Sequence, residues 1–157
     1  MVGGCGCRGQ HIWSTSIAHY QSKMGNERFL TSVLVIDDNL EILQLLARCL
    51  DRANCHPTCA ASALEGIQIA KKVKSFDLYL VDLDLPDVSG LHVGLSLRHL
   101  MKHEKVLTSP IIAVTAQSDD VTRKCVIRYG FSAFLGKPFT ERQISNLVQH
   151  YREGQRQ

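Results

Sequence analysis

Four charged residues in this sequence could together handle a phosphate group. Three short apolar runs end in charge: Asp37 and Asp38 follow the first, Asp82 the second and Lys137 the third. Such runs are typical of buried parallel strands, and open α/β sheets bind ligands where the carboxyl ends of their strands meet. We therefore expect the three carboxylates to converge.

Converging carboxylates need a nearby cation. At about 4 Å, each pair of like charges repels by roughly 4 kcal/mol when the effective dielectric constant is near 20. A small group of oxygen ligands favours Mg²⁺, which binds one or two carboxylates together with a phosphate oxygen. Lys137 adds a fixed cation that can pair with an aspartate or with a phosphoryl group.

Strand and helix patterns alternate five times along the chain. We expect strands at 32–36, 57–60, 78–81, 111–114 and 133–135. We expect helices at 39–53, 62–74, 89–103, 118–129 and 140–152. Strands separated by helices must run parallel, with right-handed crossovers and helices on both faces of the sheet. The predicted fold class is therefore α/β, doubly wound around a five-stranded parallel sheet.

Several helix starts carry capping signals. Ser62–Glu65 and Thr140–Gln143 both fit a capping box, and Ser118 precedes two aspartates in a first turn. Asp38 or Asn39 is expected to cap the first helix.

These motifs, in their order and spacing, resemble the receiver domain of two-component response regulators. The matching residues are Asp37, Asp38, Asp82 with the following Leu83–Pro86, Thr115–Ala116, and Lys137–Pro138. The resemblance covers residues 31–152 and implies a CheY-like, flavodoxin-like (βα)5 fold with strand order 2-1-3-4-5. It also implies that the site lies where strands one and three diverge.

The resemblance implies that Asp82 accepts a phosphoryl group from a histidine kinase or a histidine phosphotransfer protein. The implied cofactor is Mg²⁺, or Mn²⁺, held by Asp82, by Asp38 directly, by Asp37 through water and by the main-chain carbonyl of Asp84. The protein would then catalyse only its own phosphorylation and dephosphorylation.

Further roles follow from the same resemblance. The Thr115 hydroxyl and the Ala116 N–H would donate hydrogen bonds to the phosphoryl oxygens, and Lys137 would balance their charge. Thr115 and Phe134 would form a switch. The downstream protein would bind the face made by the fourth helix, the fifth strand and the fifth helix, where a phosphorylation-dependent dimer is a second possibility.

Composition and charge agree with a soluble cytoplasmic protein. The 157 residues are 45% apolar and 21% charged, which fits one ordinary domain. No apolar run approaches the roughly 20 residues that span a bilayer, and the N-terminal segment lacks the apolar core of a signal peptide. Residues 31–120 carry 8 Lys and Arg against 12 Asp and Glu, whereas residues 121–157 carry 7 against 2. The basic part could meet an acidic protein surface, and nucleic-acid binding is not expected because no helix-turn-helix is appended.

The six cysteines lack the spacing of a standard zinc site. Cys49 and Cys125 fall in step with apolar helix positions, Cys55 and Cys59 lie in the turn into the second strand, and the other two are in a glycine-rich tail. We expect reduced thiols.

The chain ends are the least informative parts. Residues 1–30 are expected to be a disordered extension or an amphipathic segment for a partner; alternatively, translation starts at Met24. Residues 153–157 are expected to form a short tail without an output module, as in a stand-alone receiver.

Three alternatives stay open. A haloacid-dehalogenase-type phosphatase also uses an aspartate nucleophile in a D-x-D motif, which Asp82–Asp84 fits, but the Asp37–Asp38 pair would then have no role. A receiver-fold binding module without phosphorylation is the second. A receiver detached from a longer protein is the third.

Overall fold

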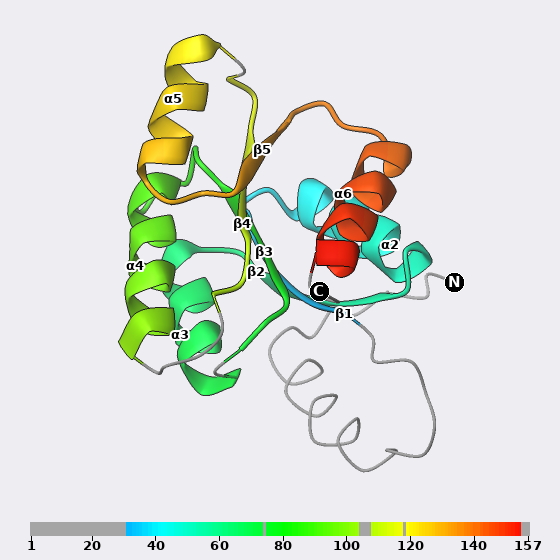
Figure 1. Ribbon diagram of the computed structural model, residues 1–157, viewed down its shortest axis with the longest axis horizontal. Helices are drawn as coiled ribbons and strands as arrows, with labels where there is room; N and C mark the ends of the chain where they lie inside the picture. Colours follow the sequence, from blue (N-terminus) through cyan, green and yellow to red (C-terminus); the bar gives the residue numbers. More distant parts are fainter. Residues whose placement is uncertain (1–30, 74, 104–107, 118, 155–157) are drawn as a thin grey trace, which may run out of the picture.

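Five short segments form one parallel β-sheet (Figure 1). In the computed structural model, the described residues are 31–73, 75–103, 108–117 and 119–154. The strands are β1 (Thr31–Ile36), β2 (Cys55–Ala60), β3 (Leu78–Asp82), β4 (Ile111–Thr115) and β5 (Ala133–Gly136). Every residue of β3 and β4 is buried, as expected for central strands covered on both faces.

The strand order is β2-β1-β3-β4-β5, and all neighbouring pairs are parallel. This confirms the predicted doubly wound fold and its strand order. β2 is an edge strand, which explains how it accommodates Pro57, a residue without an N–H for the sheet.

The described helices begin and end close to their predicted positions. They are α2 (Leu40–Arg52), α3 (Ala63–Val73), α4 (Gly90–His103), α5 (Asp120–Arg128) and α6 (Glu141–Gly154). The Asn39 side chain caps α2 by accepting hydrogen bonds from the N–H groups of Glu41 and Ile42. Thr140 and Gln143 form the predicted reciprocal capping box at the start of α6. None of the described helices is both long and apolar enough to cross a bilayer.

The helices cover the two faces of the sheet in two layers, which bury two apolar clusters. α2 and α6 pack on one face, while α3, α4 and α5 pack on the other (Figure 1). Leu46 and Ile144 are fully buried in the first cluster, and Leu97 and Val126 in the second. The sheet is therefore packed tightly between the two helix layers, so side chains at its carboxyl edge are held in fixed positions.

One detail of the prediction was wrong. β2 begins at Cys55 rather than Pro57, so Cys55 lies in the strand and not in a turn, because β1 pairs over its whole length from Thr31↔Cys55 onward. Asp119 caps α5. Ser118, which was expected to precede the first turn, lies outside the described residues, as do residues 1–30 and 155–157.

Candidate functional site

The candidate site lies at the carboxyl ends of β1, β3, β4 and β5. Asp37 follows β1 directly, Asp82 and Thr115 are the last residues of β3 and β4, and Lys137 follows β5. The chain runs from β1 to β2 on one side of β1 and then from β2 to β3 on the other side of β1. The winding of the sheet therefore reverses between β1 and β3. Ligands of open α/β sheets bind at such a point.

Three carboxylates converge there, as the sequence predicted. One oxygen from each of Asp37, Asp38 and Asp82 lies within 4.8 Å of the others. Asp37 and Asp82 are only 1% and 3% exposed, whereas Asp38 faces solvent. Asp37 is held in place because its carboxylate accepts a hydrogen bond from the Asn39 N–H at 2.9 Å. The site thus combines two sequestered negative charges with one accessible charge.

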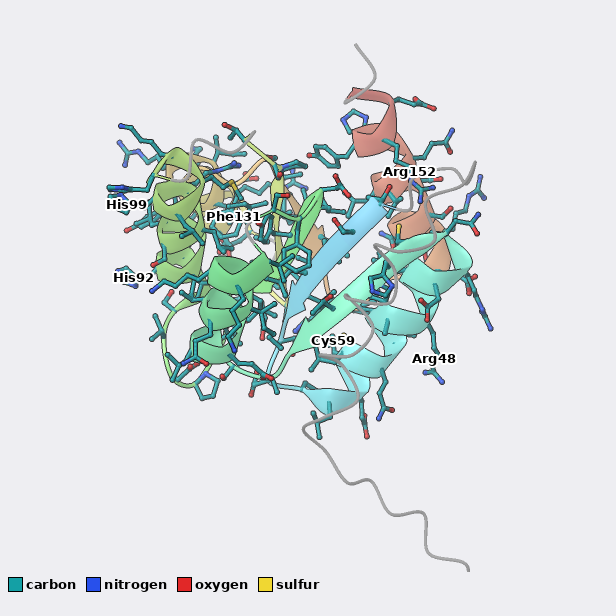
Figure 2. The ribbon with its side chains drawn as sticks, turned by 90° about the horizontal axis from the view of Figure 1, so that it is seen from below. Arg48, Cys59, His92, His99, Phe131 and Arg152 are labelled. Carbon is teal, nitrogen blue, oxygen red and sulfur yellow. The ribbon has the colours of Figure 1, made fainter. Side chains whose placement is uncertain are left out.

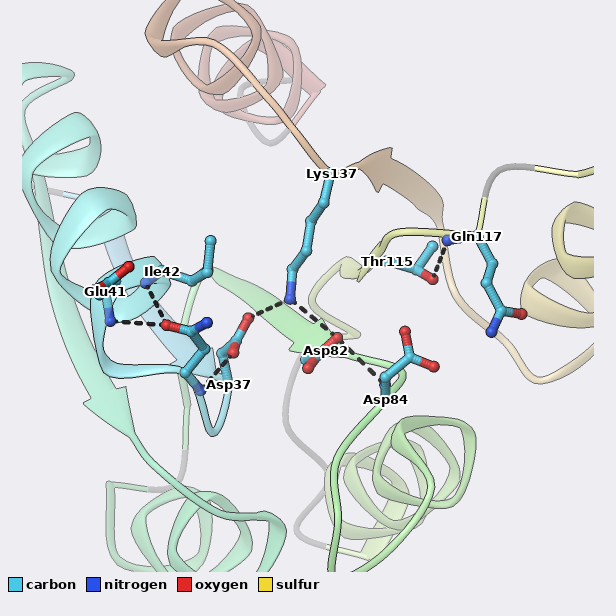
Figure 3. Close-up of polar contacts among 9 residues, drawn as sticks. Asp37, Glu41, Ile42, Asp82, Asp84, Thr115, Gln117 and Lys137 are labelled. Carbon is cyan, nitrogen blue, oxygen red and sulfur yellow. Dashed lines mark hydrogen bonds and ion pairs between the residues drawn. The ribbon is translucent and has the colours of Figure 1, made fainter.

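Lys137 supplies the cation that these charges require. Its ammonium donates to Asp37 at 2.7 Å and lies 3.3 Å from Asp82 (Figure 3). Burial lowers the pKa of Lys137, but the hydrogen bond and charge of Asp37, together with the charge of Asp82, outweigh burial and raise the pKa overall. Lys137 is therefore a fixed positive charge at neutral pH. The Lys137 N–H also donates to the Thr115 carbonyl at 2.7 Å, which anchors its backbone.

Asp82 is the carboxylate most affected by its surroundings. Burial raises the pKa of Asp82 and the charge of Asp37 raises it further, while the Asp84 N–H and Lys137 act in the opposite direction. The Asp84 N–H donates to the Asp82 carboxylate at 3.3 Å, and the Asp84 side chain is exposed (Figure 3). The neighbours of Asp82 thus neutralise its negative charge only in part, and this favours the binding of a further positive centre.

A glycine brings the start of α4 against the carboxyl end of β3. A Cβ atom added to Gly90 would lie 2.0 Å from the Asp82 carbonyl oxygen, far inside van der Waals contact. The Gly90 N–H donates to the Leu83 carbonyl at 3.1 Å. Gly90 therefore fixes the loop of residues 83–89, including the predicted carbonyl ligand of Asp84.

Thr115 faces the site from the end of β4. It is 1% exposed, and its hydroxyl oxygen accepts a hydrogen bond from the Gln117 N–H at 3.0 Å (Figure 3). That bond uses an oxygen lone pair and leaves the hydroxyl proton for another acceptor. Ala116 is exposed beside it. Both residues thus flank the carboxylates, although no described contact joins them to the carboxylates.

The donor set fits Mg²⁺ or another hard divalent cation. Three carboxylates face one ammonium, so a divalent cation would balance the remaining charge. Two of the carboxylates are buried, where uncompensated charge is costly. Oxygen ligands with one solvent-facing member suit an ion that keeps several of its waters.

The second predicted switch residue, Phe134, contacts α5. Phe134 is half-buried in β5, and the guanidinium carbon of Arg123 lies 4.6 Å from the centre of its ring, a cation–π contact. The outer surface of α5 is apolar and basic: Val121 is 72% exposed and Ile127 60%. A surface hollow of about 720 Å³ is lined by Val121, Arg123, Lys124, Cys125, Ile127 and Arg128.

Sequence reasoning missed two residues that hold the frame. The Asp87 carboxylate accepts hydrogen bonds from the N–H groups of Ala63 at 3.1 Å and Leu64 at 3.4 Å, so it caps α3 from the loop after β3. Arg98 donates to the carbonyls of Ser109 at 2.7 Å and Gly130 at 2.8 Å. Neither residue shows a local signal in the sequence. The partners of Asp87 are 23 and 24 positions away, and those of Arg98 are 11 and 32 positions away.

Comparison with protein families finds one family over most of the chain. The sequence profile of the response regulator receiver domain matches residues 33–149. The signal transduction histidine-protein kinase BarA of Escherichia coli (strain K12) is 31% identical over 123 residues, which are 78% of this chain and 13% of the kinase. The transcriptional regulatory protein GltR of Pseudomonas aeruginosa is 31% identical over 113 residues, or 72% of this chain and 45% of GltR. The matched region therefore covers less than half the length of either relative.

Solved structures show the same fold. The chemotaxis protein CheY4 of Vibrio cholerae superposes with a TM-score of 0.71 at 24% identity, covering 78% of this chain and 99% of that one. A CheY-like receiver domain protein of Methanospirillum hungatei gives a TM-score of 0.71 at 23% identity, covering 82% and 98%. At these identities the likeness bears on the fold alone.

Proposed function

Because this chain belongs to the response regulator receiver domain family of two-component systems, we propose that it accepts a phosphoryl group on Asp82 in a Mg²⁺-dependent reaction. The donor would be a histidine kinase or a histidine phosphotransfer protein. The phosphorylated form would signal through protein contacts. A cytoplasmic location belongs to the same proposal.

One observation carries the proposal: the acidic group of Asp37, Asp38 and Asp82 lies beside the Lys137 ammonium. Phosphoryl transfer passes through a loose transition state with charge on the equatorial oxygens, so catalysis depends on positioning and on charge neutralisation. A carboxylate nucleophile next to a fixed ammonium and a metal-binding pair of carboxylates supplies both.

Asp82 would be the nucleophile. One of its oxygens attacks the phosphorus of the donor phosphohistidine, the new P–O bond forms as the P–N bond breaks, and the imidazole leaves with the electron pair. Burial already strips solvent from the Asp82 carboxylate, and the Asp84 N–H and Lys137 orient it. Little reorganisation is then needed before attack.

Asp38 would ligate Mg²⁺ directly and Asp37 through water, together with Asp82 and the main-chain carbonyl of Asp84. When bound, Mg²⁺ would neutralise charge on the incoming phosphoryl oxygens. The solvent-facing position of Asp38 supports its role as a direct ligand, since it can exchange water for metal without breaking an ion pair. Asp37 already pairs with Lys137 at 2.7 Å, which supports its outer position.

The phosphoryl oxygens would be held by the Thr115 hydroxyl, the Ala116 N–H and Lys137. Thr115 and Phe134 would respond as a switch, because a bound group shifts an equilibrium only through better contacts in one state. Ala113 pairs with Phe134 and Thr115 with Gly136 across β4 and β5, so movement at Thr115 has a short path to the Phe134 ring.

The output surface would be α5, β5 and α6, with a basic and apolar character suited to an acidic protein partner. Arg123, Lys124 and Arg142 are exposed there, as are Val121 and Ile127. Beryllofluoride with Mg²⁺ mimics the phosphoryl group, and amide chemical shifts should then change across residues 119–145. Changes restricted to the surroundings of Asp82 would reject this output route, and self-association would identify the partner as a second copy.

Stoichiometry distinguishes this proposal from the phosphatase and from the non-phosphorylated binding module. Given acetyl phosphate and Mg²⁺, the protein should take up one phosphoryl group per chain and release it by slow hydrolysis. A phosphatase would instead hydrolyse a phosphate monoester through many turnovers, and a binding module would take up none.

A further inference from the structure

From α4 we infer that His99 and His103 form a two-imidazole binding site for a divalent transition-metal ion of the Cu²⁺, Ni²⁺ and Zn²⁺ class. This site is separate from the acidic group and does not depend on the proposed phosphorylation.

The two histidines lie one turn apart on the outer face of α4. Residues four apart on a helix share a face, which is the spacing that presents two histidines to one metal ion. Both side chains are exposed, and His92 lies on the same outer side, where Figure 2 shows it with His99 projecting from α4. The rings already approach each other, with centroids 4.6 Å apart and planes at 54°.

That separation matches the geometry of a chelate. An imidazole nitrogen binds Zn²⁺ at about 2.0–2.1 Å, so with roughly 1.1 Å from nitrogen to ring centre each centroid lies about 3.2 Å from the ion. Two rings bound at angles between a right angle and a tetrahedral angle then have centroids roughly 4.5–5.2 Å apart. The observed 4.6 Å lies in this range, so small side-chain rotations could aim one nitrogen of each ring at a common ion.

The ligand type decides which ions bind. Imidazole suits Cu²⁺, Ni²⁺ and Zn²⁺, and affinity for such sites rises from Ni²⁺ to Cu²⁺ and falls again at Zn²⁺. Mg²⁺ prefers oxygen ligands and should not compete. Among the described residues, Asp37, Asp38 and Asp82 are the only group of three or more His, Cys, Asp or Glu side chains close enough together to hold one ion, so two histidines would leave the remaining positions to water.

Distance keeps the two metal sites apart. Gly90 at the start of α4 touches the end of β3, and His99 is nine residues further along the helix. At about 1.5 Å per residue, the histidines lie roughly 14–20 Å along the helix axis from that end. Occupation of one site therefore has no direct electrostatic contact with the other at ordinary ionic strength.

The test is a titration of the full chain with NiCl₂ in excess MgCl₂, which keeps the acidic group occupied. Isothermal calorimetry gives the affinity, and NMR follows paramagnetic broadening of the histidine ring signals. The variants are His99→Asn, His103→Asn, the double variant and the control His92→Asn. All three positions lie on exposed helix surface, where such changes leave the fold intact.

A chelate needs both rings. Each single variant should therefore bind Ni²⁺ at least about tenfold more weakly. Replacement of a residue that only supports a metal ligand can already cause a loss of this size. The double variant should lose little more than either single variant, and His92→Asn should stay within about twofold of the unaltered chain. Binding retained in the double variant, or losses that simply add, would overturn the inference, because independent imidazoles or other groups would then hold the ion.

Discussion

The ammonium of Lys137 lies 2.7 Å from the carboxylate of Asp37, a residue 100 positions earlier in the chain. The Lys137 side chain is 18% exposed and the Asp37 side chain 2%, so solvent screens this pair only weakly. The contact joins the end of β5 to the end of β1 across the site. It is therefore a structural tie as well as part of the charge balance.

The first prediction removes this cation. Lys137→Gln should lower the free energy of unfolding by about 1.5–3 kcal/mol without Mg²⁺, because the buried Asp37 loses a charged hydrogen-bond donor. Saturating Mg²⁺ should then raise the unfolding temperature more in this variant than in the unaltered chain, because the carboxylates have no other cation. Thermal unfolding with and without Mg²⁺ measures both effects. Lys124→Gln, an exposed change on α5, is the control, and an equal Mg²⁺ response in all three proteins would contradict the charge balance.

The second prediction separates the two adjacent aspartates. Asp38→Ala should weaken Mg²⁺ binding by about 100-fold or more, since it deletes a direct ligand, whereas Asp37→Ala should weaken it less. Asp37→Ala should nevertheless cost more stability, because it also breaks the Lys137 pair and the bond from the Asn39 N–H. Calorimetric Mg²⁺ titration and thermal unfolding of the same two variants test this. The reverse order of metal affinities would exchange the two roles.

The third prediction concerns pH. The pKa of folded Asp82 is raised, chiefly by burial, so the folded state favours the protonated acid and the stability that this group contributes is lost as pH rises through its folded pKa. Asp82→Asn, which stays neutral, should therefore unfold at a higher temperature than the unaltered chain near pH 7 without Mg²⁺.

This advantage should disappear below the ordinary aspartate pKa of 3.8, where Asp82 is protonated in both states. Asp84→Asn serves as the control, because its side chain is exposed. If Asp82→Asn is less stable than the unaltered chain at neutral pH, the raised pKa of Asp82 is contradicted. Lys137 would then outweigh the effects of burial and of the Asp37 charge.

The fourth prediction is steric. Gly90→Ala should destabilise the fold by about 3 kcal/mol or more, because its Cβ would lie 2.0 Å from the Asp82 carbonyl and backbone would have to move. Mg²⁺ affinity should fall as well, since the loop that carries Asp84 shifts. Chemical denaturation gives the first quantity and calorimetry the second. Ser96→Ala, an exposed change on the same helix, should change neither.

Much of the fold could be predicted from the sequence because its signals are local. Apolar runs marked the strands, and Asn39 and Thr140 marked helix starts through their own neighbours. The convergence of Asp37 with Asp82 followed from topology, since parallel strands share one carboxyl edge. The beginning of β2 was misjudged because a proline at an edge strand is read as a break unless the pairing with β1 is known.

Contacts between distant segments could not be predicted in this way. The cap that Asp87 provides for α3 and the carbonyl contacts of Arg98 depend on where loops come together in space. The contact of Arg123 with Phe134 likewise depends on the packing of α5 against β5. Side chains of these types are ordinarily solvated, so their residue types alone carry no signal.

Phosphorylation of Asp82 is tested most directly by the intact mass of the protein after incubation with acetyl phosphate, with and without Mg²⁺. We predict one added phosphoryl group on the unaltered chain and on the control Asp84→Asn, only when Mg²⁺ is present, and none on Asp82→Asn. Undiminished labelling of Asp82→Asn, or labelling of the unaltered chain without a divalent cation, would contradict this prediction.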